Sequence, residues 1–135
     1  MKRLAVLSGA IALLALGAVP ANAHFQEFQM APRAGLTGSG NLIYRIWWQC
    51  PDGENVGGGV TIRQETTKAP NGIGISCTGN RNSTVLTFDI ISGPGFELGP
   101  ARANAHFTFN EDNNVFRQSR DITIENCSDI SWCHP

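Results

Sequence analysis

The sequence lacks any block of like charges. Its 10 lysine and arginine residues and 11 acidic residues are scattered over 135 positions. Nucleic acids and anionic membranes are recognised by a basic patch or stripe, so we expect neither as a partner. After its first 20 residues the sequence also lacks any run approaching the 18 apolar residues of a membrane-spanning helix. We therefore expect no membrane span.

The first 23 residues are organised like a secretory signal peptide. Lys2 and Arg3 precede an apolar run over residues 4–19, and residues 21–23 (Ala-Asn-Ala) form a cleavage site of the A-x-A type. We expect residues 1–23 to be removed and residues 24–135 to form a single secreted, extracellular domain, present as a monomer. A domain of this length can bury one modest core.

Only four cysteines are present, and no C-x-x-C spacing suggests a metal site. In a secreted chain they should be oxidised. Of the three possible pairings we favour Cys50–Cys77 with Cys127–Cys133, because each bridge then closes a local unit. On the chain-entropy model the first bridge contributes roughly 3–4 kcal/mol and the second roughly 2 kcal/mol.

No segment has the periodicity of an amphipathic helix. Instead, clusters of glycine, proline and asparagine separate short segments in which apolar and polar residues alternate. The predicted strands cover residues 25–30, 41–49, 60–65, 74–77, 84–91, 101–110 and 120–126. One apolar and one polar face favour antiparallel sheets packed face to face. We therefore predict an all-β, immunoglobulin-like antiparallel β-sandwich of about seven strands with two disulfides.

Motifs for nucleophilic or phosphate chemistry are missing. The sequence has no G-x-S-x-G elbow and no cysteine left free to act as a nucleophile. The glycine run at residues 57–59 lacks the lysine and the helix of a phosphate-binding loop. We therefore expect a protein that is not an enzyme and that carries no cofactor.

Two adjacent tryptophans provide the best candidate for a binding surface. Neighbours in a strand point to opposite faces, and the alternation places Trp48 inward and Trp47 outward beside Ile43. Val85 and Ile91 on a neighbouring strand would join them in an exposed apolar patch with an aromatic anchor, which is typical of an interface. Alternatively, the first strand covers this face or a bulge shifts the register.

His24 suggests a rival function. Cleavage after Ala23 would give His24 a free α-amine beside its imidazole, and these nitrogens with a second histidine, His106, would suit Cu(II). The simpler alternative is that His24 only marks the cleavage position and that His106 is an ordinary polar residue of a strand. His134, the third histidine, is the penultimate residue.

Five short motifs follow one another in a fixed order. They are GSG at residues 38–40, CPDG at 50–53, VTIRQ at 60–64, GIGISCTG at 72–79 and FELGPARANA at 96–105. In these motifs the chain resembles small secreted immunoglobulin-like β-sandwich proteins of actinobacteria, a family of unassigned function. In length, disulfide number and fold class it is also similar to the chromoprotein carriers related to neocarzinostatin, which bind an apolar ligand in a cleft.

The resemblance implies a sandwich fold and secretion, and it transfers no catalytic residue. We therefore predict a secreted, non-enzymatic binding or structural protein. Its partner would be a protein, a cell-wall component or a small apolar ligand, and the alternative is a copper-binding protein that uses His24.

Overall fold

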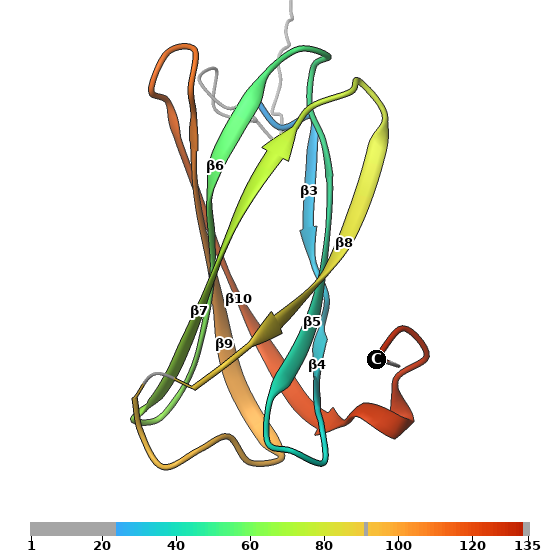
Figure 1. The fold of residues 1–135 in the computed structure, drawn as a ribbon, viewed down its shortest axis with the longest axis vertical. Helices are drawn as coiled ribbons and strands as arrows, with labels where there is room; N and C mark the ends of the chain where they lie inside the picture. The colour runs from blue at the N-terminus through green and yellow to red at the C-terminus, as the bar shows by residue number, and fades with distance from the viewer. Residues whose placement is uncertain (1–23, 91, 134–135) are drawn as a thin grey trace, which may run out of the picture.

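The computed structural model describes residues 24–90 and 92–133, so the predicted signal peptide lies outside the described residues. Eight strands and one short 3-10 helix follow one another along the chain (Figure 1). The elements are β3 (Glu27–Met30), β4 (Arg33–Leu36), β5 (Leu42–Gln49), β6 (Asn55–Gln64), β7 (Thr67–Ser76), β8 (Arg81–Phe88), β9 (Gly99–Phe109), β10 (Val115–Asn126) and η1 (Cys127–Asp129). Among the described residues, no helix is long and apolar enough to cross a membrane.

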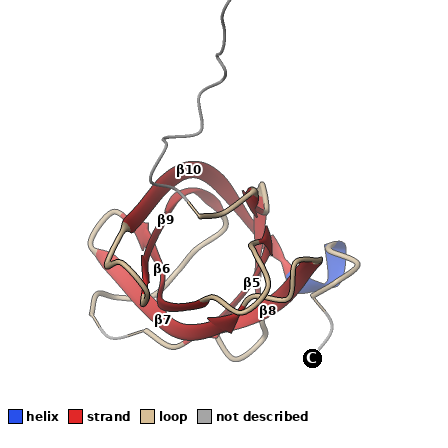
Figure 2. Ribbon diagram, turned by 90° about the horizontal axis from the view of Figure 1, so that it is seen from above, coloured by secondary structure: helices blue, strands red, loops and turns tan. Residues whose placement is uncertain are grey.

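All eight strands belong to one mixed sheet, which curls into a half-barrel around the core (Figure 2). The hydrogen-bonded order is β3-β5-β4-β10-β9-β6-β7, and β8 pairs with the other edge of β5. At the open edge, the Asn71 side chain of β7 donates to the Thr87 carbonyl of β8 over 2.6 Å. The all-β prediction is confirmed, whereas the sheet is a curled half-barrel and not clearly two packed antiparallel layers.

The first strand is divided, which the sequence did not lead us to expect. β3 pairs antiparallel with the second half of β5. β4 runs parallel to β10 along its whole length and pairs with the start of β5 only at Gly35 and Leu36. Pro32 lies between the two strands and its carbonyl accepts a hydrogen bond from Thr123 over 3.1 Å. A proline has no amide N–H to continue the ladder with β5, so the chain changes partner here. The prediction of purely antiparallel pairing is wrong at this contact.

Apolar residues on the inner side of the strands form the core. Tyr44, Ile46, Phe107 and Phe109 are buried, and so are Ile122 and Ile124 of the last strand. An aromatic cluster closes one end, where Phe25 packs edge-on against Phe107, Phe109 and Phe116 with ring centroids 4.9 to 5.8 Å apart. The Tyr44 hydroxyl is satisfied within this core because it donates to the Ala31 carbonyl over 2.6 Å.

Three strands extend further than predicted. β6 begins at Asn55, β7 at Thr67 and β10 at Val115, whereas the predicted strands begin at residues 60, 74 and 120. Glycine in β6 reflects close backbone approach, because a Cβ on Gly59 would collide with the Asn71 carbonyl of β7. β7 tolerates Pro70 because it is the last strand in the sheet order.

Both predicted disulfides are confirmed. Cys50–Cys77 joins the residue after β5 to the residue after β7, and Cys127–Cys133 closes the segment that follows β10. No cysteine remains free. The bridges therefore fix the chain at two places where strands end.

Candidate functional site

The outer side of β3, β5 and β8 carries Trp47, and we call it the Trp47 face. In β5, Trp48 is buried with 8% of its surface exposed, whereas Trp47 is half-buried. The register places Gln29 of β3 and Ser83 of β8 directly opposite Trp47. The predicted orientation of the two tryptophans is therefore the one in the structure.

Two arginines hold the Trp47 ring. The guanidinium carbon of Arg45 lies 5.0 Å from the ring centroid and that of Arg81 lies 5.9 Å away. Arg81 also reaches from β8 across β5 to β3, where it donates to Glu27 over 3.0 Å and to Gln29 over 3.1 Å. Such contacts fix the ring and surround it with hydrogen-bonding groups. Arg45 lies two residues before Trp47 in β5, and the alternation of a strand puts both side chains on the same face.

The remaining members of the predicted apolar patch lie in different surroundings. Val85 is 43% exposed on the Trp47 face, directly opposite Arg45. Ile43 is only 6% exposed because Ile130 and Cys133 pack against it, so its predicted exposure is wrong. Ile91 lies outside the described residues. The Trp47 face is therefore an aromatic ring in polar surroundings and not an apolar patch.

His24 lies at the end of the sheet where β6 begins and β9 turns into β10, and it belongs to a separate hydrogen-bond network. Its Nδ1 lies 3.0 Å from a carboxylate oxygen of Glu54, and its Nε2 lies 2.6 Å from one of Asp112. The ring also packs against Phe109 with centroids 4.5 Å apart. Because a carboxylate only accepts hydrogen bonds, both contacts are made together only when both ring nitrogens carry a proton.

The two carboxylates change the acidity of this histidine. Burial alone would lower the pKa of His24, but the hydrogen bonds to Asp112 and Glu54 outweigh it and raise the pKa above its usual value. The pKa of Asp112 is lowered, chiefly by a hydrogen bond from the Asn114 backbone and further by His24. Both carboxylates are distant from His24 in the sequence, by 30 and 88 positions, so no local motif predicted this network.

His106 does not share these partners. It projects from the outer face of β9, where its Nε2 lies 3.3 Å from a guanidinium nitrogen of Arg117. His134 lies outside the described residues. Within residues 24–90 and 92–133, no group of three or more histidine, cysteine, aspartate or glutamate side chains could hold a metal ion.

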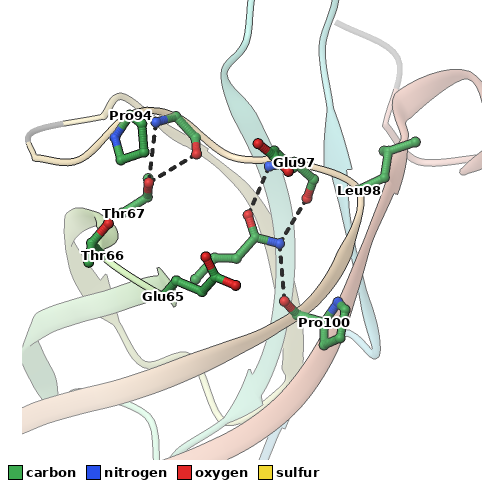
Figure 3. A pocket seen from close by; sticks show the side chains of 9 residues that line it. Glu65, Thr66, Thr67, Pro94, Glu97, Leu98 and Pro100 are labelled. Carbon is green, nitrogen blue, oxygen red and sulfur yellow. Dashed lines mark hydrogen bonds between the residues drawn. The ribbon is translucent and has the colours of Figure 1, made fainter.

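A hollow of about 320 Å³ lies at the opposite end, between the β6–β7 turn and the segment before β9 (Figure 3). Its central polar groups are already paired. The Gln64 amide binds Glu97 and Pro100, and the Thr67 hydroxyl binds Gly95 over 2.9 Å. These hydrogen bonds anchor the segment before β9 to the turn between β6 and β7, and Figure 3 shows both sets of bonds.

The comparisons with known proteins add no assignment for this site. No protein-family model matches the chain, and neither a curated protein nor a solved structure is significantly similar to it. The resemblance to small actinobacterial sandwich proteins therefore stays a prediction.

Proposed function

We propose that this chain is a secreted, non-enzymatic binding protein whose Trp47 face contacts a polysaccharide of the cell wall. The observation that carries the proposal is the Trp47 ring, which Arg45 and Arg81 hold on a surface made mostly of polar side chains. A sugar presents C–H groups on its ring faces and hydroxyls at its edges. The exposed part of the Trp47 ring offers an apolar surface to the C–H groups, and the guanidinium and amide groups beside it can bind the hydroxyls.

The composition of the Trp47 face argues against the other two partners. A small apolar ligand requires an apolar concavity, and the burial of Ile43 leaves Val85 as the main exposed aliphatic side chain beside Trp47. The core of a protein–protein interface is depleted in acidic residues, whereas the Glu27 carboxylate pairs with Arg81 on this face. A hydroxyl-rich ligand uses these same groups as hydrogen-bond partners.

Secretion and an immunoglobulin-like fold belong to the same proposal. Two disulfides support an oxidising, extracellular environment. The strand orders β3-β5-β8 and β10-β9-β6-β7 correspond to the A-B-E and G-F-C-C′ orders of immunoglobulin domains of the variable type. The curled sheet would then be a sandwich joined along one side by β4.

The test is sedimentation of the oxidised protein with insoluble polysaccharides, namely peptidoglycan, chitin and cellulose. Trp47→Ala should weaken binding at least tenfold to whichever polymer sediments with the wild-type protein, because Trp47 supplies the aromatic ring on the outer side of β3, β5 and β8. Val115→Ala is the matched control, since Val115 is 40% exposed on β10 and should leave binding unchanged. Circular dichroism would verify that both variants are folded.

Two results would overturn the proposal. In the first, the wild-type protein sediments with none of the three polymers. In the second, Trp47→Ala binds as tightly as Val115→Ala does.

A further inference from the structure

Three cations stand side by side across the sheet on the outer face of β7, β6 and β9. In the register, Lys68 lies directly opposite Arg63, and Arg63 lies directly opposite Arg102. Neighbouring strands are about 4.8 Å apart, so the three side chains leave the sheet in one close row. We call these three residues the cation row. It lies across the curl from β5 (Figure 2).

The cation row is incompletely neutralised. Asp121 of β10 ends the row and lies 2.6 Å from Arg102, but its side chain is 87% exposed. Among the described residues, neither Arg63 nor Lys68 has a carboxylate within ion-pair distance. Like charges placed directly opposite one another destabilise a sheet. The folded protein therefore keeps an unfavourable arrangement that a bound anion would relieve.

Space for a ligand adjoins the cation row on two sides. A hollow of about 360 Å³ is lined by Arg63, Lys68, Thr66, Ser92 and Glu65, whose carboxylate is the one acidic group among them. On the other side, a groove of about 330 Å³ runs over glycines and Thr61 of β6. Its walls also include the polar side chains of Asn71, Asn104 and His106.

From these contacts we propose that the cation row binds an acidic polysaccharide. Its carboxylate or sulfate groups would pair with Arg63, Lys68 and Arg102, and its hydroxyls would lie in the groove beside Thr61 and Asn104. Guanidinium groups suit carboxylate and sulfate because they donate two parallel hydrogen bonds to such planar or forked acceptors.

The chemistry of this face disfavours a nucleic acid. Proteins that bind single strands combine cations with aromatic side chains on which the bases stack. On the same face, two residues along each strand from the cation row, the register aligns Pro70, Thr61, Asn104 and Ser119. Two residues further it aligns two glycines with His106 and Arg117. No phenylalanine, tyrosine or tryptophan belongs to these rows. The proposal is independent of the Trp47 face, which lies on other strands.

Titration of the oxidised full chain with polygalacturonate and with heparin, by calorimetry at low and at physiological salt, tests the proposal. Arg63→Gln/Lys68→Gln should weaken binding of these polymers at least tenfold and reduce its salt dependence. Arg33→Gln/Arg120→Gln removes the same charge from β4 and β10, outside both proposed binding surfaces, and is the matched control. It should change the affinity less than twofold. Neutral dextran should not bind.

Several results would overturn the assignment. One such result is that neither acidic polymer binds. Another is that both double variants lose affinity equally, because this would indicate attraction by net charge alone. Tight binding of a thymidine oligonucleotide through the same residues, without binding of the polysaccharides, would assign the cation row to nucleic acid instead. If a cell-wall polymer binds through Trp47 while polygalacturonate and heparin fail to bind, the proposed function stands and this proposal is overturned.

Discussion

Nε2 of His24 lies 2.6 Å from a carboxylate oxygen of Asp112, which joins the first described residue to the turn between β9 and β10. The other ring nitrogen faces Glu54, just before β6. One imidazole therefore ties the start of the domain to two neighbouring loops. Phe25, the next residue, is buried in the aromatic cluster, so this tie also holds part of the core.

We expect the contribution of His24 to stability to fall as the pH rises. The folded-state pKa lies above the ordinary value of 6.5, so the stabilisation is complete below pH 6.5 and disappears as the pH passes the folded-state pKa. The pKa of Asp112 is lowered from 3.8, so its contribution to stability is present above pH 3.8 and is lost as the pH falls through the lowered pKa. Urea unfolding at pH 5.5 and at pH 8.5 would measure the difference.

His24→Gln should reduce this pH dependence, because glutamine does not titrate. His106→Gln is the control and should retain it, since His106 contacts Arg117 instead of a carboxylate. An unchanged difference between the two pH values in His24→Gln would contradict the assignment.

The two tryptophans should differ in their effect on folding. Trp48→Ala empties a buried core position and should cost about 3–5 kcal/mol of unfolding free energy. Trp47 is half-buried and only borders the core, so Trp47→Ala should cost about 1 kcal/mol. Chemical denaturation of both variants decides this, and equally severe losses would mean that Trp47 is a structural residue.

Regular alternation explains why part of the fold could be predicted from the sequence. In β5 and β9 the apolar residues recur at every second position, and the burial pattern follows them. β4 was missed because Arg33–Leu36 is short, contains a glycine and has no alternation. The first half of β6 was missed because its glycines indicate a loop, although here they allow a neighbouring strand to approach.

Gly35 should be intolerant of any side chain. A Cβ at this position of β4 would collide with Sγ of Cys133 and crowd Cys127, so Gly35→Ala should destabilise the protein by about 1–3 kcal/mol. Gly38→Ala is a suitable control, because its Cβ would meet no atom within 4 Å. Thermal unfolding compares the two, and equal melting temperatures would refute the expected clash.

The two disulfides should contribute unequally. Cys50–Cys77 spans 27 positions and Cys127–Cys133 only 6. On the chain-entropy model, replacing both cysteines of the first pair by serine should cost roughly 3–4 kcal/mol, against roughly 2 kcal/mol for the second pair. Guanidinium unfolding of the two double variants measures this order. A larger loss for the second pair would show that its packing on Ile43 outweighs loop closure.

The candidate surfaces were harder to predict than the strands, because they depend on contacts between distant segments. Alternation placed Ile43 outward, but Ile130 from the end of the chain covers it. The sequence has no run of like charges, yet strand pairing brings Lys68, Arg63 and Arg102 into one row. A list of charges along the chain contains no information about which strands become neighbours.

The parallel pairing of β4 with β10 has a consequence for the order of folding. It joins residues near the two ends of the domain, and the Arg33–Glu125 ion pair within it spans 92 positions. Contacts of such long sequence separation form slowly, because most of the chain must be ordered first. While the C-terminal residues are still being synthesised, this seam cannot close. The chain thus lacks a complete native sheet until β10 has been synthesised.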